Sequence, residues 1–124
     1  CDMCMEEIHK GSVLWGCRQC DFDACAKCLE GPQLEAFPDG FEGLTELKSL
    51  RVVKHKLTAL PLQVGRMSSL EVLCLSSNQL SSLPSSFVNM VALRLLELYG
   101  NCLQELPDGL GNLVALQELN VHDN

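Results

Sequence analysis

The stretch LEVLCLSSNQLSSLP at residues 70–84 decides the fold, because its pattern returns every 23 residues. Shifting the sequence by this period aligns Leu47, Leu70, Leu93 and Leu116; Leu50, Leu73, Leu96 and Leu119; Leu57, Leu80 and Leu103; and Pro38, Pro61, Pro84 and Pro107. A fixed period of apolar positions with a proline in phase is the signature of stacked structural repeats. No single unit can bury its leucines alone, so we expect the units to stack around a continuous core.

Each unit reads L-x-x-L-x-L-x-x-N-x-L-x-x-L-P, and the chain therefore closely resembles the leucine-rich repeat family. The resemblance implies an α/β solenoid, a segment of a right-handed horseshoe with one short strand per unit on its concave side. It also implies an inward-facing ladder of side-chain amides, formed here by Asn78, Asn101 and Asn124. An amide both donates and accepts hydrogen bonds, which suits a buried ladder. His55 takes this position in the first full unit and interrupts the asparagine series.

The side chains between the inward leucines of each strand should point to the concave surface. These positions are Ser49, Arg51 and Val53; Val72, Cys74 and Ser76; Leu95, Glu97 and Tyr99; Glu118, Asn120 and His122. From them we predict a surface for a protein partner made by Arg51, Val53, Val72, Cys74, Leu95, Glu97, Tyr99 and Asn120. The apolar members are more numerous than solubility requires, which suits a partner segment lying across the strands. Scattered surface hydrophobic residues are an equally good explanation.

The composition fits one leucine-built domain or two small ones. The chain has 124 residues, 47% of them apolar, with one Trp, one Tyr and a formal net charge of −7. The excess negative charge is spread over both halves, which argues against a nucleic-acid or anionic-membrane surface. No apolar run approaches a membrane span and no secretory leader is visible, so we expect a reducing, cytoplasmic setting inside the cell.

Six of the eight cysteines form three Cys-x-x-Cys pairs: Cys1/Cys4, Cys17/Cys20 and Cys25/Cys28. Pairs at this spacing let two thiolates reach one metal ion from a tight turn, so we expect zinc binding. Disulfide bonding or simple burial of the thiols is the alternative. Zinc would also explain how this segment folds, because about 30 residues cannot fold on apolar burial alone.

Residues 15–28, WGCRQCDFDACAKC, resemble the core of ZZ-type zinc fingers and the cysteine-rich domains of the DC1 and diacylglycerol-binding groups. In these families a small cross-brace module holds interleaved zinc sites. The resemblance assigns the first site to Cys1, Cys4, Cys25 and Cys28. The second site departs from the ZZ pattern, because no histidine stands between Leu29 and Lys54. Cys17 and Cys20 then bind a second zinc with His9, bind it with a residue absent from this chain, or bind none.

We predict two domains, a zinc-binding module at residues 1–30 and about 3.5 to 4 leucine-rich repeats at residues 31–124. One period before Leu47 and Leu50 stand Ala24 and Lys27, so we expect no strand in the first repeat. The zinc module is then expected to cap the first apolar layer. The chain begins without Met and ends within a repeat, and we expect it to be a fragment of a longer protein.

Two classes of function fit these patterns. The first is a non-catalytic interaction scaffold, since the Leu-Pro form of the repeat resembles intracellular proteins that organise small GTPase, kinase or phosphatase signalling. The second is a substrate-recognition fragment of a ubiquitin ligase or another signalling enzyme, because cross-braced zinc modules resemble RING folds. The cysteine spacing lacks the Cys-x-His step of a RING. No phosphate-binding loop, nucleophile–base pair or carboxylate dyad appears, so we expect the chain itself to be non-enzymatic.

Overall fold

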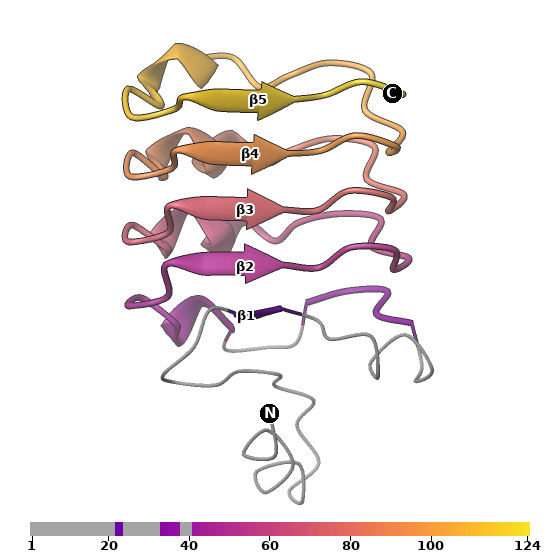
Figure 1. The fold of residues 1–124 in the computed structure, drawn as a ribbon, viewed down its shortest axis with the longest axis horizontal. Coiled ribbons are helices and arrows are strands. Elements are labelled where there is room, and N and C mark those ends of the chain that lie inside the picture. The colour runs from indigo at the N-terminus through magenta and orange to yellow at the C-terminus, as the bar shows by residue number, and fades with distance from the viewer. Residues whose placement is uncertain (1–21, 24–32, 38–40) are drawn as a thin grey trace, which may run out of the picture.

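The computed structural model describes residues 22–23, 33–37 and 41–124. In these residues short strands alternate with 3-10 helices along one stack (Figure 1). The strands are β1 (Phe22–Asp23), β2 (Ser49–Arg51), β3 (Val72–Cys74), β4 (Leu95–Glu97) and β5 (Glu118–Asn120). The helices are η4 (Phe41–Gly43), η5 (Leu62–Arg66), η6 (Ser85–Asn89) and η7 (Leu110–Asn112). None of the helices in this part of the chain has the length and apolar character needed to cross a membrane.

The strands form one parallel sheet whose order follows the sequence. Leu50 pairs with Leu73, which pairs in turn with Leu96, so each step from β2 to β5 moves 23 residues along the chain. Parallel neighbours require a crossover connection, and the 3-10 helices lie in these connections behind the sheet (Figure 1). The stacked parallel strands are those of a solenoid, as the period predicts.

Strand β1 is not expected from the sequence. Phe22 pairs with Leu50, 28 residues later, and Asp23 pairs with Arg51. This offset is longer than the 23-residue period. Aligning the repeats by their period therefore places Lys27, and not Phe22, opposite Leu50, and it predicts no strand at residues 22–23. The expectation that the first repeat lacks a strand is therefore wrong.

The crossover segments adopt the 3-10 form, and the described ranges contain no α-helix. Pro61 and Pro84 precede η5 and η6 in the extended conformation, with φ of −71° and −67° and ψ of 152° and 151°. Proline fixes φ and lacks an N–H group, so it suits the junction between an extended segment and a helical turn. Helices this short commonly take the tighter 3-10 form.

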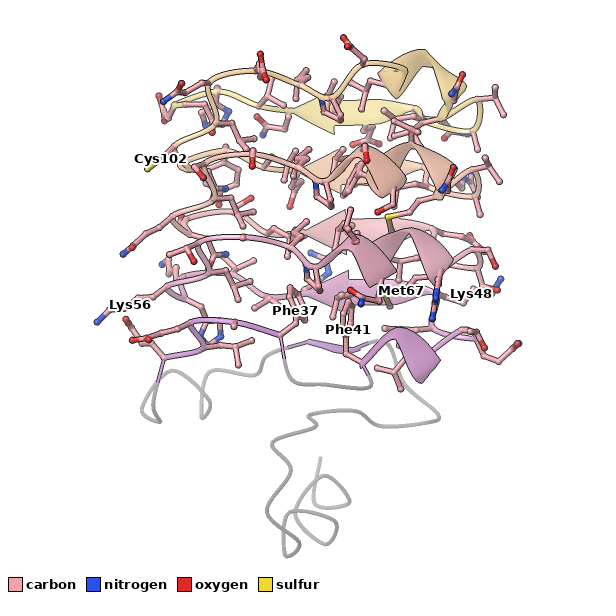
Figure 2. All side chains as sticks on the ribbon, turned by 180° about the vertical axis from the view of Figure 1, so that it is seen from behind. Phe37, Phe41, Lys48, Lys56, Met67 and Cys102 are labelled. Atoms are coloured by element: carbon pink, nitrogen blue, oxygen red, sulfur yellow. The ribbon has the colours of Figure 1, made fainter. Side chains whose placement is uncertain are left out.

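The hydrophobic core lies between the sheet and the 3-10 helices. Leu73 and Leu96 from the strands and Phe87 from η6 are completely buried. At the β1 side of the stack, Phe37 and Phe41 pack together with ring centroids 4.7 Å apart (Figure 2). At the other side, Leu119 of β5 is 43% exposed, whereas its equivalents Leu73 and Leu96 are fully covered by neighbouring repeats. Burial is therefore greatest in the central repeats.

Candidate protein-binding surface

The face of the sheet opposite the 3-10 helices, here called the strand face, carries the residues predicted to bind a partner (Figure 1). Side chains alternate along a strand, so the residues on either side of each buried leucine share this face. Strand register arranges them in three rows. The first row is Ser49, Val72, Leu95 and Glu118; the second is Arg51, Cys74, Glu97 and Asn120; the third is Val53, Ser76, Tyr99 and His122.

The residues of the predicted binding set differ in exposure. Arg51 is exposed, Cys74 is fully buried, and the partly buried members are Val53, Val72, Leu95, Glu97, Tyr99 and Asn120. Cys74 has a small side chain between Arg51 and Glu97, its register partners. Strands lie about 4.8 Å apart, so larger neighbouring side chains can cover a small one. Cys74 offers no exposed area to a partner, which corrects its inclusion in the binding set.

The apolar residues of the strand face fall into two groups. Val72 and Leu95 are register partners in the first row and expose adjoining apolar surface. Val53 and Tyr99 both lie in the third row, where the buried Ser76 separates them. The structure therefore brings together Val72 and Leu95 and leaves Val53 apart from Tyr99.

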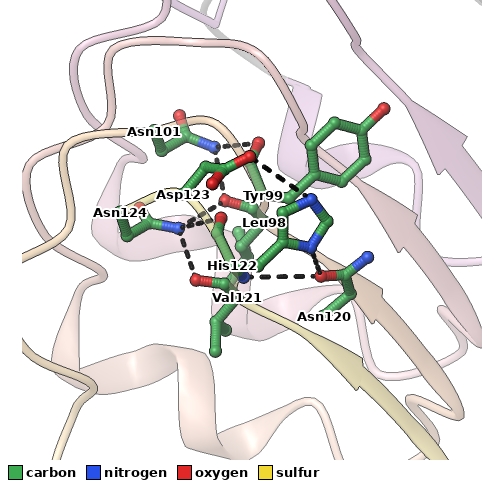
Figure 3. A network of polar contacts seen from close by, with 8 residues as sticks. All are labelled: Leu98, Tyr99, Asn101, Asn120, Val121, His122, Asp123 and Asn124. Atoms are coloured by element: carbon green, nitrogen blue, oxygen red, sulfur yellow. Dashed lines mark hydrogen bonds and ion pairs between the residues drawn. The ribbon is translucent and has the colours of Figure 1, made fainter.

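The ring of Tyr99 is held by His122, its neighbour in the third row. The two rings are stacked, with centroids 4.9 Å apart and planes 4° from parallel. Nδ1 of His122 contacts Oδ1 of Asn120, and Nε2 of His122 lies 3.6 Å from Oδ2 of Asp123 (Figure 3). The sequence places His122 on this face without assigning it a role. His122 lies one 23-residue period after Tyr99, and this spacing could have predicted that the two rings are neighbours.

One hydrogen-bond pattern repeats where the strands end. Oδ1 of Asn101 accepts from the main-chain N–H of Leu80 at 3.1 Å, and its Nδ2 donates to main-chain carbonyls of two successive repeats at 3.1 and 2.8 Å. Asn78 and Asn124 make the equivalent bonds one repeat earlier and one repeat later. Each amide thus joins neighbouring repeats and fixes the spacing of the strands that present the face.

His55 supplies part of this pattern in the repeat of β2. Its Nδ1 accepts from the main-chain N–H of Leu34 at 3.2 Å, as Oδ1 of Asn78 accepts from Leu57. Partial burial lowers the pKa of His55 from its ordinary value of 6.5. Only an unprotonated Nδ1 can accept a hydrogen bond, so the bond and the burial both favour the neutral ring. His55 therefore replaces the acceptor of the asparagine amide.

A line of polar side chains borders the strand face where the strands begin. Nζ of Lys48 lies 3.2 Å from Oε1 of Glu71, and Arg94 lies 4.0 Å from Oε2 of the same carboxylate. Arg94 also donates to Oε1 of Gln117 at 3.4 Å. These residues follow one another at the repeat period. Their exposure means that the pairs add little to stability; they set the charge along this border.

The predicted zinc ligands lie outside the described residues. They are Cys1, Cys4, Cys25 and Cys28 for the first site, and Cys17, Cys20 and His9 for the second. Among residues 22–23, 33–37 and 41–124, no three His, Cys, Asp or Glu side chains gather as metal ligands would. Within the predicted zinc module only β1 is described, between the second and third cysteine pairs.

Comparisons with known proteins agree with this architecture. Residues 17–124 match the family described as leucine-rich repeat region. The leucine-rich repeat domain of the type III effector XopL is 31% identical, with a TM-score of 0.68 over 73% of this chain and 34% of that chain. The leucine-rich repeat protein LIC12759 of Leptospira interrogans is 28% identical, with a TM-score of 0.60 over 84% and 35%. The match thus spans about a third of each of these chains. No curated protein matches the sequence.

Proposed function

The chain belongs to the leucine-rich repeat family, and we propose that it binds a protein partner through its strand face. Leucine-rich repeat domains generally mediate protein–protein interaction, which favours a non-catalytic interaction module. The observation that carries the proposal is the register pair of Val72 and Leu95, two partly exposed apolar side chains that lie side by side on this face. Contiguous exposed apolar surface is a property of interaction sites.

Tyr99 is the residue we expect to contribute most to binding. Its side chain is partly exposed, and its ring is already stacked on His122. An ordered amphipathic ring offers contact area and a hydroxyl group with little rotamer entropy left to lose. Glu97 and Asn120 are neighbours in the second row and would supply polar contacts around the apolar centre.

Comparing the proteins captured by three forms of the chain tests the proposed surface. The double variant Leu95→Ser/Tyr99→Ala removes apolar side chains from the strand face. The control Leu62→Ser removes a leucine that is 64% exposed on η5, away from the strand face. Proteins captured by the wild type and the control but lost by the double variant support the proposal. Proteins captured equally by all three forms, or lost only by the control, would place the site elsewhere.

We also propose that residues 1–30 bind at least one zinc ion through Cys1, Cys4, Cys25 and Cys28. The Cys-x-x-Cys spacing supports this assignment, and a reducing cytoplasmic setting would keep the thiols available. The pairing of β1 with β2 supports a position for this module at the first repeat, as a cap.

Elemental analysis of protein purified under reducing conditions tests the zinc site. We expect at least one zinc per chain in the wild type and in Cys102→Ser, whose cysteine lies in the repeats. Cys25→Ser should bind less metal and lose native structure in residues 1–30, because structural zinc contributes on the order of 10 kcal/mol to such modules. Wild-type protein that keeps its native spectra in a strong chelator would contradict the assignment.

A further inference from the structure

Charge changes sign along the stack of strands. Residues 47–55, which contain β2, carry Lys48, Arg51 and Lys54 and no carboxylate. The equivalent segment at residues 116–124, which contains β5, carries Glu118 and Asp123 and no Lys or Arg. Counting histidine as neutral, the first segment has a formal charge of +3 and the last has −2. The chain as a whole is acidic, so this positive segment is a local feature. Arg51 lies in the second row of the strand face, Lys48 on the border where the strands begin, and Lys54 directly after Val53 of the third row.

The segments between these ends do not reverse the trend. Residues 70–78 carry only Glu71, and residues 93–101 carry Arg94 and Glu97. Glu71 lies within 4.0 Å of both Lys48 and Arg94, so one carboxylate is shared by two cations. Asp23 of β1 is the register partner of Arg51. Glu71 therefore offsets part of the charge of Lys48, and both Arg51 and Lys54 are exposed.

The positive and negative ends are far enough apart to act separately. Strands β2 and β5 are three steps apart in the sheet, which corresponds to about 14 Å at about 4.8 Å per step. The Debye length at physiological ionic strength is about 8 Å. Solvent ions therefore screen each end from the other, and each end acts on the part of a partner closest to it.

Between the two ends lies the apolar centre of the strand face. Val72 and Leu95 occupy the first row of β3 and β4, and Tyr99 follows β4 in the third row. A partner that crosses the strands meets cations, apolar side chains and carboxylates in that order.

We infer that the partner of the strand face is a polypeptide segment with an acidic end over β2, apolar side chains over β3 and β4, and a basic end over β5. This inference rests on the proposed function and adds the chemistry and direction of the partner. To match about 14 Å, its acidic and basic residues would be four to five positions apart if extended, at about 3.3 Å per residue. They would be nine to ten positions apart in a helix, at about 1.5 Å per residue.

The probe is a library of random 12-residue peptides displayed on phage and selected against the full chain at low salt. Selected peptides should carry acidic and basic groups on either side of an apolar stretch, at one of these spacings. Each is then measured against Lys48→Gln/Arg51→Gln/Lys54→Gln, where we expect affinity to fall at least about tenfold because charge complementarity is lost at one end. The control Lys56→Gln/Arg66→Gln removes two exposed cations outside residues 47–55 and should leave affinity unchanged.

A spin label on the acidic end of a selected peptide gives the direction. It should broaden amide signals of β2 more than those of β5, and a label on the basic end should do the reverse. Peptides that bind the triple variant normally but lose affinity for Leu95→Ser/Tyr99→Ala would overturn the charge inference and leave the strand face as the site. If the peptides bind both variants with the same affinity as the wild type, the proposed function itself would be overturned. Selection of uniformly acidic peptides, or of none, would also overturn the bipolar partner.

Discussion

The side-chain amide of Asn101 donates a hydrogen bond to the main-chain carbonyl of Leu75, one repeat earlier, at 3.1 Å. The same amide donates to Leu98 in its own repeat and accepts from Leu80. One buried side chain thus satisfies main-chain groups in two adjacent repeats. The carbonyls of Leu75 and Leu98 each accept a second bond, from Asn78 and Asn124. The N–H of Leu80 bonds the amide oxygen of Asn101, so each repeat depends on the asparagine of the next one to satisfy this buried group.

Asn101→Ala should lower the free energy of unfolding by about 1–3 kcal/mol, because the buried N–H of Leu80 loses its acceptor and a buried polar group without a partner costs about that much. Asn124 makes equivalent bonds, but its side chain is exposed, and water can replace the amide. Asn124→Ala should therefore cost less than about 1 kcal/mol. Urea denaturation of the two variants measures the difference. Equal losses would show that the ladder does not depend on burial.

Gly65 and Gly111 occupy the same position in the repeat, one period before and one period after Val88. Replacement by alanine should affect stability in opposite ways at these two glycines. At Gly65 of η5, an added Cβ would overlap the main-chain oxygen of Ser86 in η6. The backbone must shift to admit it, so Gly65→Ala should destabilise the chain by about 1–3 kcal/mol. At Gly111 of η7, no atom lies within 4 Å of the added Cβ.

Gly111→Ala should therefore be neutral or should stabilise the chain by up to about 1 kcal/mol, since alanine restricts the unfolded state. Thermal unfolding of the two variants, followed by circular dichroism, provides the comparison. A Gly65→Ala variant as stable as Gly111→Ala would show that the 3-10 helices are not closely stacked in solution.

His55 should make the stability of the first repeat depend on pH. Partial burial lowers its folded pKa below 6.5, so the unfolded chain takes up a proton more readily than the folded chain. The stability linked to this residue is present above pH 6.5 and is lost as the pH falls towards the folded pKa. Protonation of Nδ1 also removes the hydrogen bond from Leu34.

The variant His55→Asn supplies the amide found in the later repeats and has no group that titrates there. Between pH 7.5 and 5.5, the wild type should lose more stability than this variant in urea denaturation. Comparing the two chains cancels the contributions of the other histidines. Equal loss of stability in the two chains would mean that folding does not lower the pKa of His55.

The repeat period predicted the sheet because parallel pairing of equivalent units has one alignment that buries every inward leucine. A shift of one residue would move Leu73 and Leu96 to the strand face. The same reasoning failed at β1, where Phe22 reaches Leu50 through an offset longer than the period. An irregular connection carries no periodic signal, so pattern alone could not place this strand.

The strand face was predictable in position but not in exposure. Alternation along a strand assigns Cys74 and Tyr99 to the same face. Whether each is accessible depends on the size of its neighbours, and Cys74 is covered while Tyr99 remains partly open. The acceptor role of His55 was also outside the pattern, because it depends on where Leu34 comes to lie.

The most direct test of the strand face as the binding surface is the dissociation constant of a captured partner, measured by calorimetry. Tyr99→Ala should weaken binding about 5- to 150-fold, the effect of losing about 1–3 kcal/mol at an interface anchor. Gln104→Ala changes an exposed residue outside the three rows and should leave the constant unchanged. A partner whose affinity is the same for Tyr99→Ala and the wild type, but falls for Gln104→Ala or Cys25→Ser, would contradict the account.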